Sequence, residues 1–280
     1  MTDFDYTAKR VVVTGGATGV GAALLDLLAE LGAPDVTVLD VKEPTGPHET
    51  FLPTDLSDRD AVDAAVARID GPIDALFNNA GVADTQPAGT VFRVNALAPI
   101  RLADALLPQI SDAQSVGGGA IVVTSSIAGM AWPSRLAVIQ ELLALDDWDA
   151  MLEWFDGREL GVDPYPFTKE TMQVWTMRFA AAARQHGVRV NSVCPGPVDT
   201  PLMKDFRATM GDAGLDFTIQ HAGGRMSTAR EVASVIAFLG SPAAAFVSGQ
   251  NVNIDFGFEA SMTTGMLDTS SVATQSGRSS

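Results

Sequence analysis

The sequence predicts an α/β fold, a doubly wound parallel sheet of seven strands with helices on both faces. Three observations support this prediction. Short β-branched or apolar runs alternate along the chain with helical patterns of roughly ten residues or more, the order of βαβ units. A glycine-rich turn joins the first run to the first helix. Polar or glycine residues follow several runs, at the carboxyl edge where parallel sheets bind ligands.

The periodicity of the sequence places each element. Gly32 ends the first helix, Asp58 caps the second, and Pro99 is expected to bend the third. The predicted strands are 10–14, 36–39, a run ending near Leu52, 74–77, 120–124, 188–193 and 251–254. The predicted helices are 22–31, 58–69, 90–109, 165–185 and 228–240. We expect one domain over 1–262, followed by a mobile Ser/Thr/Gly-rich tail over 263–280.

Composition excludes several classes of protein. A formal net charge of -16 disfavours nucleic acid and anionic membrane surfaces. The acidic N-terminus lacks an apolar signal core, and no apolar run approaches ~18 residues, so we expect a cytoplasmic location. The single cysteine, Cys194, lies in an apolar run and is expected to be buried and unreactive. His48, His186 and His221 have no ligand-like spacing, so no metal site is expected.

The turn after the first strand has the composition of a dinucleotide-binding loop. Between a strand and a helix, glycines let the backbone approach a pyrophosphate, which the N–H groups of the helix N-terminus then bind. Such a turn is weak evidence in isolation, because glycine turns are common. The residues expected to make these contacts are Gly15, Ala17, Thr18, Gly19 and Val20.

Asp40 ends the second strand, about 20 residues past this loop. An acid at that position hydrogen-bonds the adenosine ribose hydroxyls and repels a 2′-phosphate, so we expect NAD(H) as the cofactor. Lys42 leaves some tolerance of the phosphorylated cofactor open. The alternative interpretation of Asp40 is a solvated strand end.

Tyr165 and Lys169 stand four residues apart at the start of a predicted helix and therefore share one face. An ammonium beside a phenol favours the phenolate, so Lys169 is expected to lower the pKa of Tyr165 from its usual ~10. Tyr165 would then be a general acid or base near neutral pH. Alone, the spacing is also compatible with coincidence.

With these segments placed, the chain resembles the short-chain dehydrogenase/reductase superfamily in its single-domain, Rossmann-type form. The matching motifs run in the family's order: Thr14 to Gly21, Asn78-Asn79-Ala80-Gly81, Asn95, Ser125-Ser126, Tyr165 with Lys169, and Pro195 to Thr200. Within the superfamily, the stretch 233–244 resembles the bacterial 3α-hydroxysteroid dehydrogenase/carbonyl reductase type.

The resemblance implies a role for each motif. Ser126 would bind the substrate oxygen, Tyr165 would exchange the proton, Lys169 would hold the nicotinamide ribose, and Asn95 would position a water. Further cofactor contacts are implied for Asp55, Leu56, Asn79, Ala80, Gly81, Pro195, Val198 and Thr200. Singly, several have structural alternatives: Ser126 could end a strand, Asn95 could satisfy backbone in a bent helix, and Thr200 could cap a helix.

The resulting prediction is an NAD(H)-dependent oxidoreductase that interconverts a secondary alcohol and a ketone. An apolar lid over 201–225, with Trp132 and Trp175 nearby, favours a bulky steroid, terpenoid or aromatic substrate, although core packing explains the same residues. One alternative is an NADPH-dependent carbonyl reductase, against which Asp40 argues. Another is a non-catalytic nucleotide-binding protein, which would have no need of the set formed by Asn95, Ser126, Tyr165 and Lys169.

The segment 131–162 makes the interval before Tyr165 longer than the family usually has. It is rich in acids, and its apolar residues recur at three- and four-residue steps, which predicts a helical insertion: Leu142, Leu145, Trp148, Leu152 and Phe155. We expect the insertion to cover the helix that begins near Tyr165, block one tetramer interface and favour a homodimer. The alternative is a helical pair that only packs on the domain.

Overall fold

The computed structural model describes residues 4–111 and 118–267. Its centre is a seven-stranded sheet of order β3-β2-β1-β4-β5-β6-β9, in which all neighbours are parallel. The predicted sheet is therefore confirmed. Its strands are β1 (Arg10–Thr14), β2 (Asp35–Asp40), β3 (Thr50–Pro53), β4 (Ala75–Asn78), β5 (Ala120–Thr124), β6 (Arg189–Pro195) and β9 (Asn251–Ile254).

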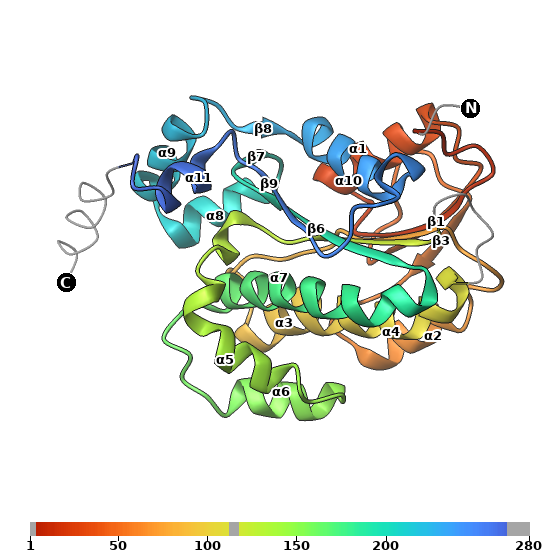
Figure 1. The fold of residues 1–280 in the computed structure, drawn as a ribbon, viewed down its shortest axis with the longest axis horizontal. Coiled ribbons are helices and arrows are strands. Elements are labelled where there is room, and N and C mark those ends of the chain that lie inside the picture. Colours follow the sequence, from red (N-terminus) through yellow and green to blue (C-terminus); the bar gives the residue numbers. More distant parts are fainter. Residues whose placement is uncertain (1–3, 112–117, 268–280) are drawn as a thin grey trace.

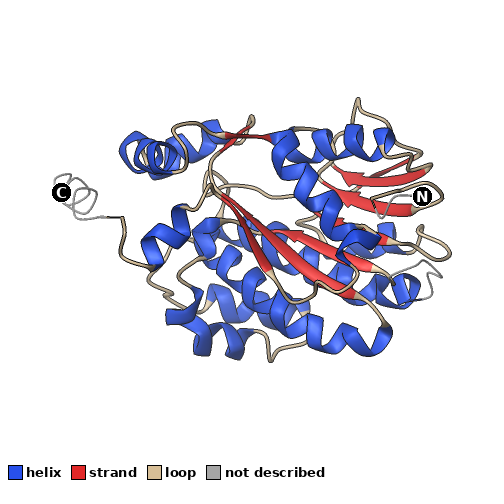
Figure 2. Ribbon diagram, turned by 45° about the horizontal axis from the view of Figure 1, so that its top comes forward, coloured by secondary structure: helices blue, strands red, loops and turns tan. Residues whose placement is uncertain are grey.

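Helices cover both faces of the sheet, as Figures 1 and 2 show. One face carries α1 (Gly19–Glu30) and α10 (Ala229–Gly240), which pack against each other over an apolar core. The other carries α2 (Arg59–Val66), α3 (Ala88–Phe92), α4 (Ala98–Ser111) and α7 (Pro164–Ala183). Because both faces are covered, the central strands read as continuous apolar runs and not as alternating ones.

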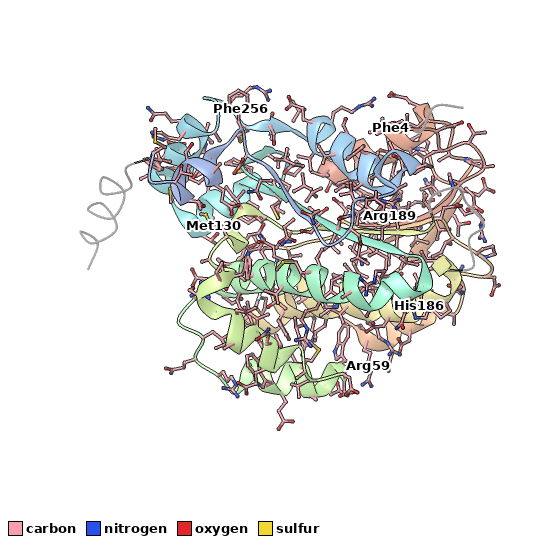
Figure 3. All side chains as sticks on the ribbon, in the orientation of Figure 1. Phe4, Arg59, Met130, His186, Arg189 and Phe256 are labelled. Carbon is pink, nitrogen blue, oxygen red and sulfur yellow. The ribbon has the colours of Figure 1, made fainter. Side chains whose placement is uncertain are left out.

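Arg189 ties α10 to the sheet from the start of β6 (Figure 3). Its buried guanidinium donates to the carbonyls of Leu239 at 2.6 Å, Ser241 at 3.1 Å and Ala244 at 3.1 Å. These carbonyls lie at and beyond the C-terminal end of α10, where the helix itself provides no N–H donors. The carbonyls of Ser241 and Ala244 also accept from the N–H groups of Ala244 and Val247, so Arg189 adds a second donor there and holds the end of α10 against β6.

Shorter elements gather mostly at the carboxyl end of the sheet. Two of them, β7 (Val198–Asp199) and β8 (Ser227–Thr228), pair in parallel as a separate small sheet that the sequence analysis missed. The others there are α8 (Met203–Met210), α9 (Asp212–His221) and α11 (Phe258–Thr263). Within 4–111 and 118–267 there are also three 3-10 turns: Ile127–Gly129, Arg184–His186 and Pro242–Ala244.

The predicted helix over 90–109 is longer and less regular than expected. It starts at Ala88 and contains a π-helical segment, Arg93–Leu97, between α3 and α4. The N–H of Ala98 bonds to the carbonyl of Arg93, five residues back. Pro99 lacks the N–H that would bond to the carbonyl of Asn95, so the proline accounts for a widened turn and not only a bend.

Other boundaries differ by a few residues. The first helix begins at Gly19 and not at 22, because the glycine-rich turn itself supplies its first turn. The second ends at Val66, with Ala67 as its C-cap, and not at 69. The predicted tail over 263–280 lies largely outside the described residues, which end at 267.

The insertion is helical, as predicted, and consists of α5 (Trp132–Leu142) and α6 (Trp148–Asp156). Figure 1 shows the pair below α7. Phe155 of α6 stacks on Phe92 with ring centroids 4.3 Å apart and lies 6.0 Å from the ring of Phe167 in α7. From α5, Arg135 donates at 2.6 Å to Glu170, whose side chain is fully buried in α7.

The described ranges contain neither a candidate membrane-spanning helix nor a candidate metal-binding cluster. No helix there combines the length and the apolar character needed to cross a membrane. In the same ranges, no three His, Cys, Asp or Glu side chains group together in a way that would hold a metal ion.

Arg135→Met should lower the free energy of unfolding by about 3–5 kcal/mol, because it leaves the carboxylate of Glu170 buried without its partner. Adding Glu170→Met removes the stranded charge and should restore much of the loss. Urea denaturation of the single and double variants measures both effects. A double variant as unstable as Arg135→Met would contradict the assignment of this pair.

Candidate active site

A cavity of about 780 Å³ opens at the carboxyl edge of the sheet, on the side that Met130 marks in Figure 3. The strand order reverses between β1 and β4, and such a reversal leaves a crevice outside the strand ends. Sixteen of the predicted site residues line this cavity: Gly15, Thr18, Gly19, Val20, Asp40, Asp55, Leu56, Asn79, Ala80, Gly81, Ser126, Tyr165, Lys169, Pro195, Val198 and Thr200. Ala17 and Asn95 do not line it.

The glycine-rich loop lies close against the neighbouring strand end. Gly15 has a φ of +73°, and a Cβ on it would lie 2.6 Å from the Cα of Ala80. A Cβ on Gly21 would lie 1.8 Å from the carbonyl oxygen of Gly15. Thr18, the N-cap of α1, makes no side-chain cap hydrogen bond within the described chain. The first turn of α1 therefore keeps N–H groups for an anionic ligand, which fits a pyrophosphate.

Asp40 links this loop to the end of β2. Its carboxylate accepts from the N–H of Ala17 at 3.0 Å and from the N–H of Lys42 at 3.0 Å. The N–H of Ala17 thus holds the carboxylate of Asp40 in place. Ala17 itself does not line the cavity. Val41, the next residue, is 73% exposed and lines the same region.

Hydroxyl and amide groups hold the central strand ends together. Thr14 Oγ1 accepts from the N–H groups of Asn79 at 3.0 Å and Ala80 at 3.1 Å. The amide of Asn79 donates to the carbonyl of Gly15 at 3.2 Å and accepts from Thr124 at 3.2 Å. These bonds cross from β1 through β4 to β5, so the glycine loop and the strand before Ser126 keep a fixed separation.

Tyr165 and Lys169 come from the first two turns of α7, one turn apart. Tyr165 is 9% exposed and Lys169 is 4% exposed. The ammonium of Lys169 lies 5.3 Å from the centre of the Tyr165 ring and donates to the carbonyl of Thr124 at 2.9 Å. Ser126 faces the pair from the end of β5 and hydrogen-bonds Tyr165.

The prediction that Lys169 lowers the pKa of Tyr165 is wrong for this structure. Burial raises the pKa of Tyr165 to about 12; the hydrogen bond with Ser126 opposes this rise, and the charge of Asp84 adds to it. Burial also lowers the pKa of Lys169 to about 8. Burial disfavours the charged form of both side chains because it removes their contact with water. The ammonium of Lys169 donates its hydrogen bond to the carbonyl of Thr124 and not to the phenol.

Asn95 lies in the π-helical segment and is 2% exposed. Its amide oxygen accepts from the N–H of Val82 at 2.9 Å, and its amide nitrogen donates to the carbonyl of Val82 at 2.9 Å. A Cβ on Gly81 would lie 3.5 Å from Asn95 Oδ1 and 3.7 Å from Lys169 Nζ. Asn95 is therefore behind Gly81, close to Lys169 but outside the cavity wall.

The far side of the cavity is formed by α8 and α9. Phe206 of α8 meets the ring of Tyr165 edge-on, with centroids 4.8 Å apart. Leu202, Met203 and Leu215 also line this side. Trp132 and Trp175 do not, contrary to expectation: Trp132 packs against the core beneath the sheet, and Trp175 stacks on Phe179 in a separate groove.

The acceptor for the N–H of Tyr165 was not predicted. Asp84, from the segment after β4, accepts this N–H at 2.8 Å. Asp84 precedes Tyr165 by 81 positions, so no local pattern reveals the contact. The one available signal is Pro164-Tyr165-Pro166, which leaves a lone N–H between two prolines. The Thr124 carbonyl, as a main-chain group, carries no sequence signal.

Comparisons with known proteins agree with this geometry. Residues 9–137 match a family model described as short chain dehydrogenase, and residues 159–259 match one described as Enoyl-(Acyl carrier protein) reductase. The unmatched stretch between them lies in the helical insertion. The structure resembles the crystal structure of the 3-alpha-hydroxysteroid dehydrogenase from Pseudomonas sp. B-0831 complexed with NADH, with a TM-score of 0.76 at 30% identity, covering 91% of this chain and 99% of that one.

Two curated relatives cover most of the chain. It is 32% identical over 253 residues to the coniferyl-alcohol dehydrogenase of Pseudomonas sp. (strain HR199 / DSM 7063), with 90% of this chain and 96% of the relative covered. It is 32% identical over 263 residues to the 3-alpha-hydroxysteroid dehydrogenase/carbonyl reductase of Comamonas testosteroni, covering 90% and 97%. The chain therefore belongs to the short-chain dehydrogenase/reductase superfamily and is an oxidoreductase of that family.

Proposed function

We propose that this protein is an NAD(H)-dependent dehydrogenase that interconverts a secondary alcohol and a ketone. The observation that carries the proposal is the position of Ser126, Tyr165 and Lys169 in the same cavity as the glycine-rich loop. A proton-transfer group thus lies within reach of a site whose backbone fits a dinucleotide. A binding-only protein would have no need to bury a lysine beside a phenol.

The residues around the cavity fit a nicotinamide dinucleotide. The turn of Gly15 and Gly19 would hold the pyrophosphate, Asp40 the adenosine ribose, and Asn79 to Gly81 with Lys169 the second ribose. Pro195, Val198 and Thr200 would contact the carboxamide. When bound, the cofactor supplies the hydride chemistry, while the chain supplies binding, orientation and proton transfer.

Three side chains of the chain would handle the proton. Ser126 would hold the substrate oxygen, and Tyr165 would take the alcohol proton during oxidation or return it during reduction. Lys169, anchored on Thr124, would hold the nicotinamide ribose in register with Tyr165. Because the pKa of Tyr165 stands at about 12, oxidation should accelerate as pH rises through the neutral range.

The substrate side of the cavity supports a bulky, largely apolar alcohol or ketone. Leu202, Met203, Phe206 and Leu215 line it, and we propose that the segment 201–225 acts as a lid over the bound substrate. The names of the relatives include aromatic, alicyclic and steroid alcohols, which agrees with this class. An NAD-reduction screen across steroid, terpene, aromatic and small aliphatic alcohols tests it; turnover confined to the small aliphatic alcohols would contradict it.

Tyr165→Phe should lower kcat for alcohol oxidation by at least about 100-fold, because it removes the proton acceptor while keeping the ring. NAD binding, measured by fluorescence titration, should persist. Activity retained within a few-fold of wild type would reject Tyr165 as the acid or base.

Asp40→Ala should raise the NADP to NAD ratio of kcat/KM by about tenfold or more, because it removes a charge that repels the 2′-phosphate. Asp40→Asn provides the matched comparison, since its amide oxygen can still accept from the N–H of Ala17. A ratio unchanged in both variants would remove Asp40 from cofactor choice, and a wild-type ratio above one would favour the NADPH-dependent alternative.

We further propose a homodimer. The insertion covers the face of α7 that carries Phe167 and Glu170, so this face is not free to pair with a second copy. Light scattering of the full chain should give the mass of two protomers. A tetramer with the α7 helices paired across protomers would overturn this proposal.

A further inference from the structure

The first turn of α7 has an unusual set of hydrogen-bond donors. A helix normally begins with four N–H groups that lack partners within the helix. Here Pro164 and Pro166 have no N–H, and the N–H of Phe167 bonds to the carbonyl of Asp163. This leaves the N–H of Tyr165 as the donor that needs an acceptor from elsewhere.

Asp163 does not provide that acceptor, although it occupies the N-cap position. Its side chain makes no cap hydrogen bond with the described residues. The acceptor is the carboxylate of Asp84, which receives the N–H of Tyr165 at 2.8 Å. Asp84 is half-buried and does not line the cavity, so it touches neither the substrate nor the cofactor region.

We propose that Asp84 is a positioning residue that caps the helix of Tyr165 from a different part of the chain and places a negative charge near its phenol. This inference rests on the proposed role of Tyr165 in proton transfer. Because Asp84 follows the Asn78 to Gly81 motif by a few residues, the cap ties Tyr165 to the strand end that also forms the cofactor side of the cavity.

Several charged or titratable groups surround the two residues. Asp163 on α7 faces Asp84, and burial together with the charge of Asp163 raises the pKa of Asp84. Around Tyr165 lie Asp84 itself, Lys169 one turn further along α7, and the buried thiol of Cys194 on β6. Asp205 of α8 lines the same cavity. Among these, Asp84 is the carboxylate bound directly to the backbone of Tyr165.

The negative charge and the hydrogen bond of Asp84 have opposite consequences. The hydrogen bond fixes the start of α7 and so the direction of the phenol. The charge opposes formation of a phenolate and raises the pKa of Tyr165. A neutral acceptor of the same shape separates the two, because asparagine caps a helix about as well as aspartate does.

Asp84→Asn should therefore keep the cap and lower the pKa of Tyr165 by about half a unit or more. A lower pKa moves the rising limb of kcat/KM for alcohol oxidation toward lower pH. At any pH below the pKa of Tyr165 in both proteins, oxidation by Asp84→Asn should be about threefold faster than by wild type. A limb that stays in place in Asp84→Asn would overturn the electrostatic part of the proposal.

Asp84→Ala should lose the cap, lowering the melting temperature by about 2–4 °C. It should also lower kcat, because Tyr165 loses its anchor. The matched control is Asp147→Ala, which removes the N-cap of α6, an aspartate that accepts from two backbone N–H groups at 3.0 Å and lies away from the cavity. The control should lower the melting temperature as much as Asp84→Ala does. It should leave kcat and the pH dependence of kcat/KM unchanged. If Asp84→Ala matched the control in kcat and pH limb, a positioning role would be rejected.

A direct titration separates this inference from the proposed function. The chain has only 2 tyrosines, Tyr6 and Tyr165, so ring-labelled tyrosine gives two NMR signals that Tyr165→Phe assigns. Burial also raises the pKa of Tyr6, so its signal should titrate later. The Tyr165 signal should begin to shift at lower pH in Asp84→Asn than in wild type, even if no alcohol is turned over. An unchanged onset would overturn the inference while leaving the proposed dehydrogenase chemistry to the kinetic test of Tyr165→Phe.

Discussion

Lys169 carries an ammonium into a site that is only 4% exposed, and much of the surrounding structure serves to make that burial tolerable. Among the described residues, its hydrogen-bond acceptor is a main-chain carbonyl, that of Thr124, which is held in place because β5 pairs with β4 and β6 on either side. The desolvation lowers the pKa of Lys169 to about 8, so the side chain is poised between charged and neutral forms. Through the Nζ atom of Lys169, the start of α7 is therefore joined to the end of β5 at the wall of the cavity.

The sheet was predictable because its signals are local. Strands that are covered on both faces have apolar sequences. The observed β5 and β9 have the same bounds as the predicted strands 120–124 and 251–254. The residues that meet at the cavity were predictable for the same reason, since parallel strands bring their carboxyl ends together. What could not be predicted depends on contacts between distant segments, such as Asp84 with Tyr165 or Arg135 with Glu170. The pKa of Tyr165 could not be predicted either. The sequence spacing reveals Lys169 as a neighbour, but it does not reveal the burial that raises the pKa.

The insertion illustrates how one segment can change a surface without changing the site. Neither α5 nor α6 contributes a residue to the cavity wall, although α5 begins only a few residues after Ser126. Instead, the pair buries Phe167 and Glu170, on the face of α7 turned away from the substrate. A fully buried carboxylate on that face is stable only beside Arg135, so the helix and the insertion must have been adapted to each other.

The strand order also has a consequence for synthesis of the chain. Strands β3, β2, β1, β4 and β5 form a contiguous block made entirely of residues before 125, and β6 and β9 then add to one edge in the order in which they are made. On the ribosome, this five-stranded block, which holds the glycine-rich loop, can pair before Tyr165 and Lys169 emerge. The partner of α1, by contrast, is α10, which arrives late. The apolar side of α1 that packs on α10 therefore lacks its cover from the synthesis of α1 until that of α10, which is most of the time that the chain takes to be made.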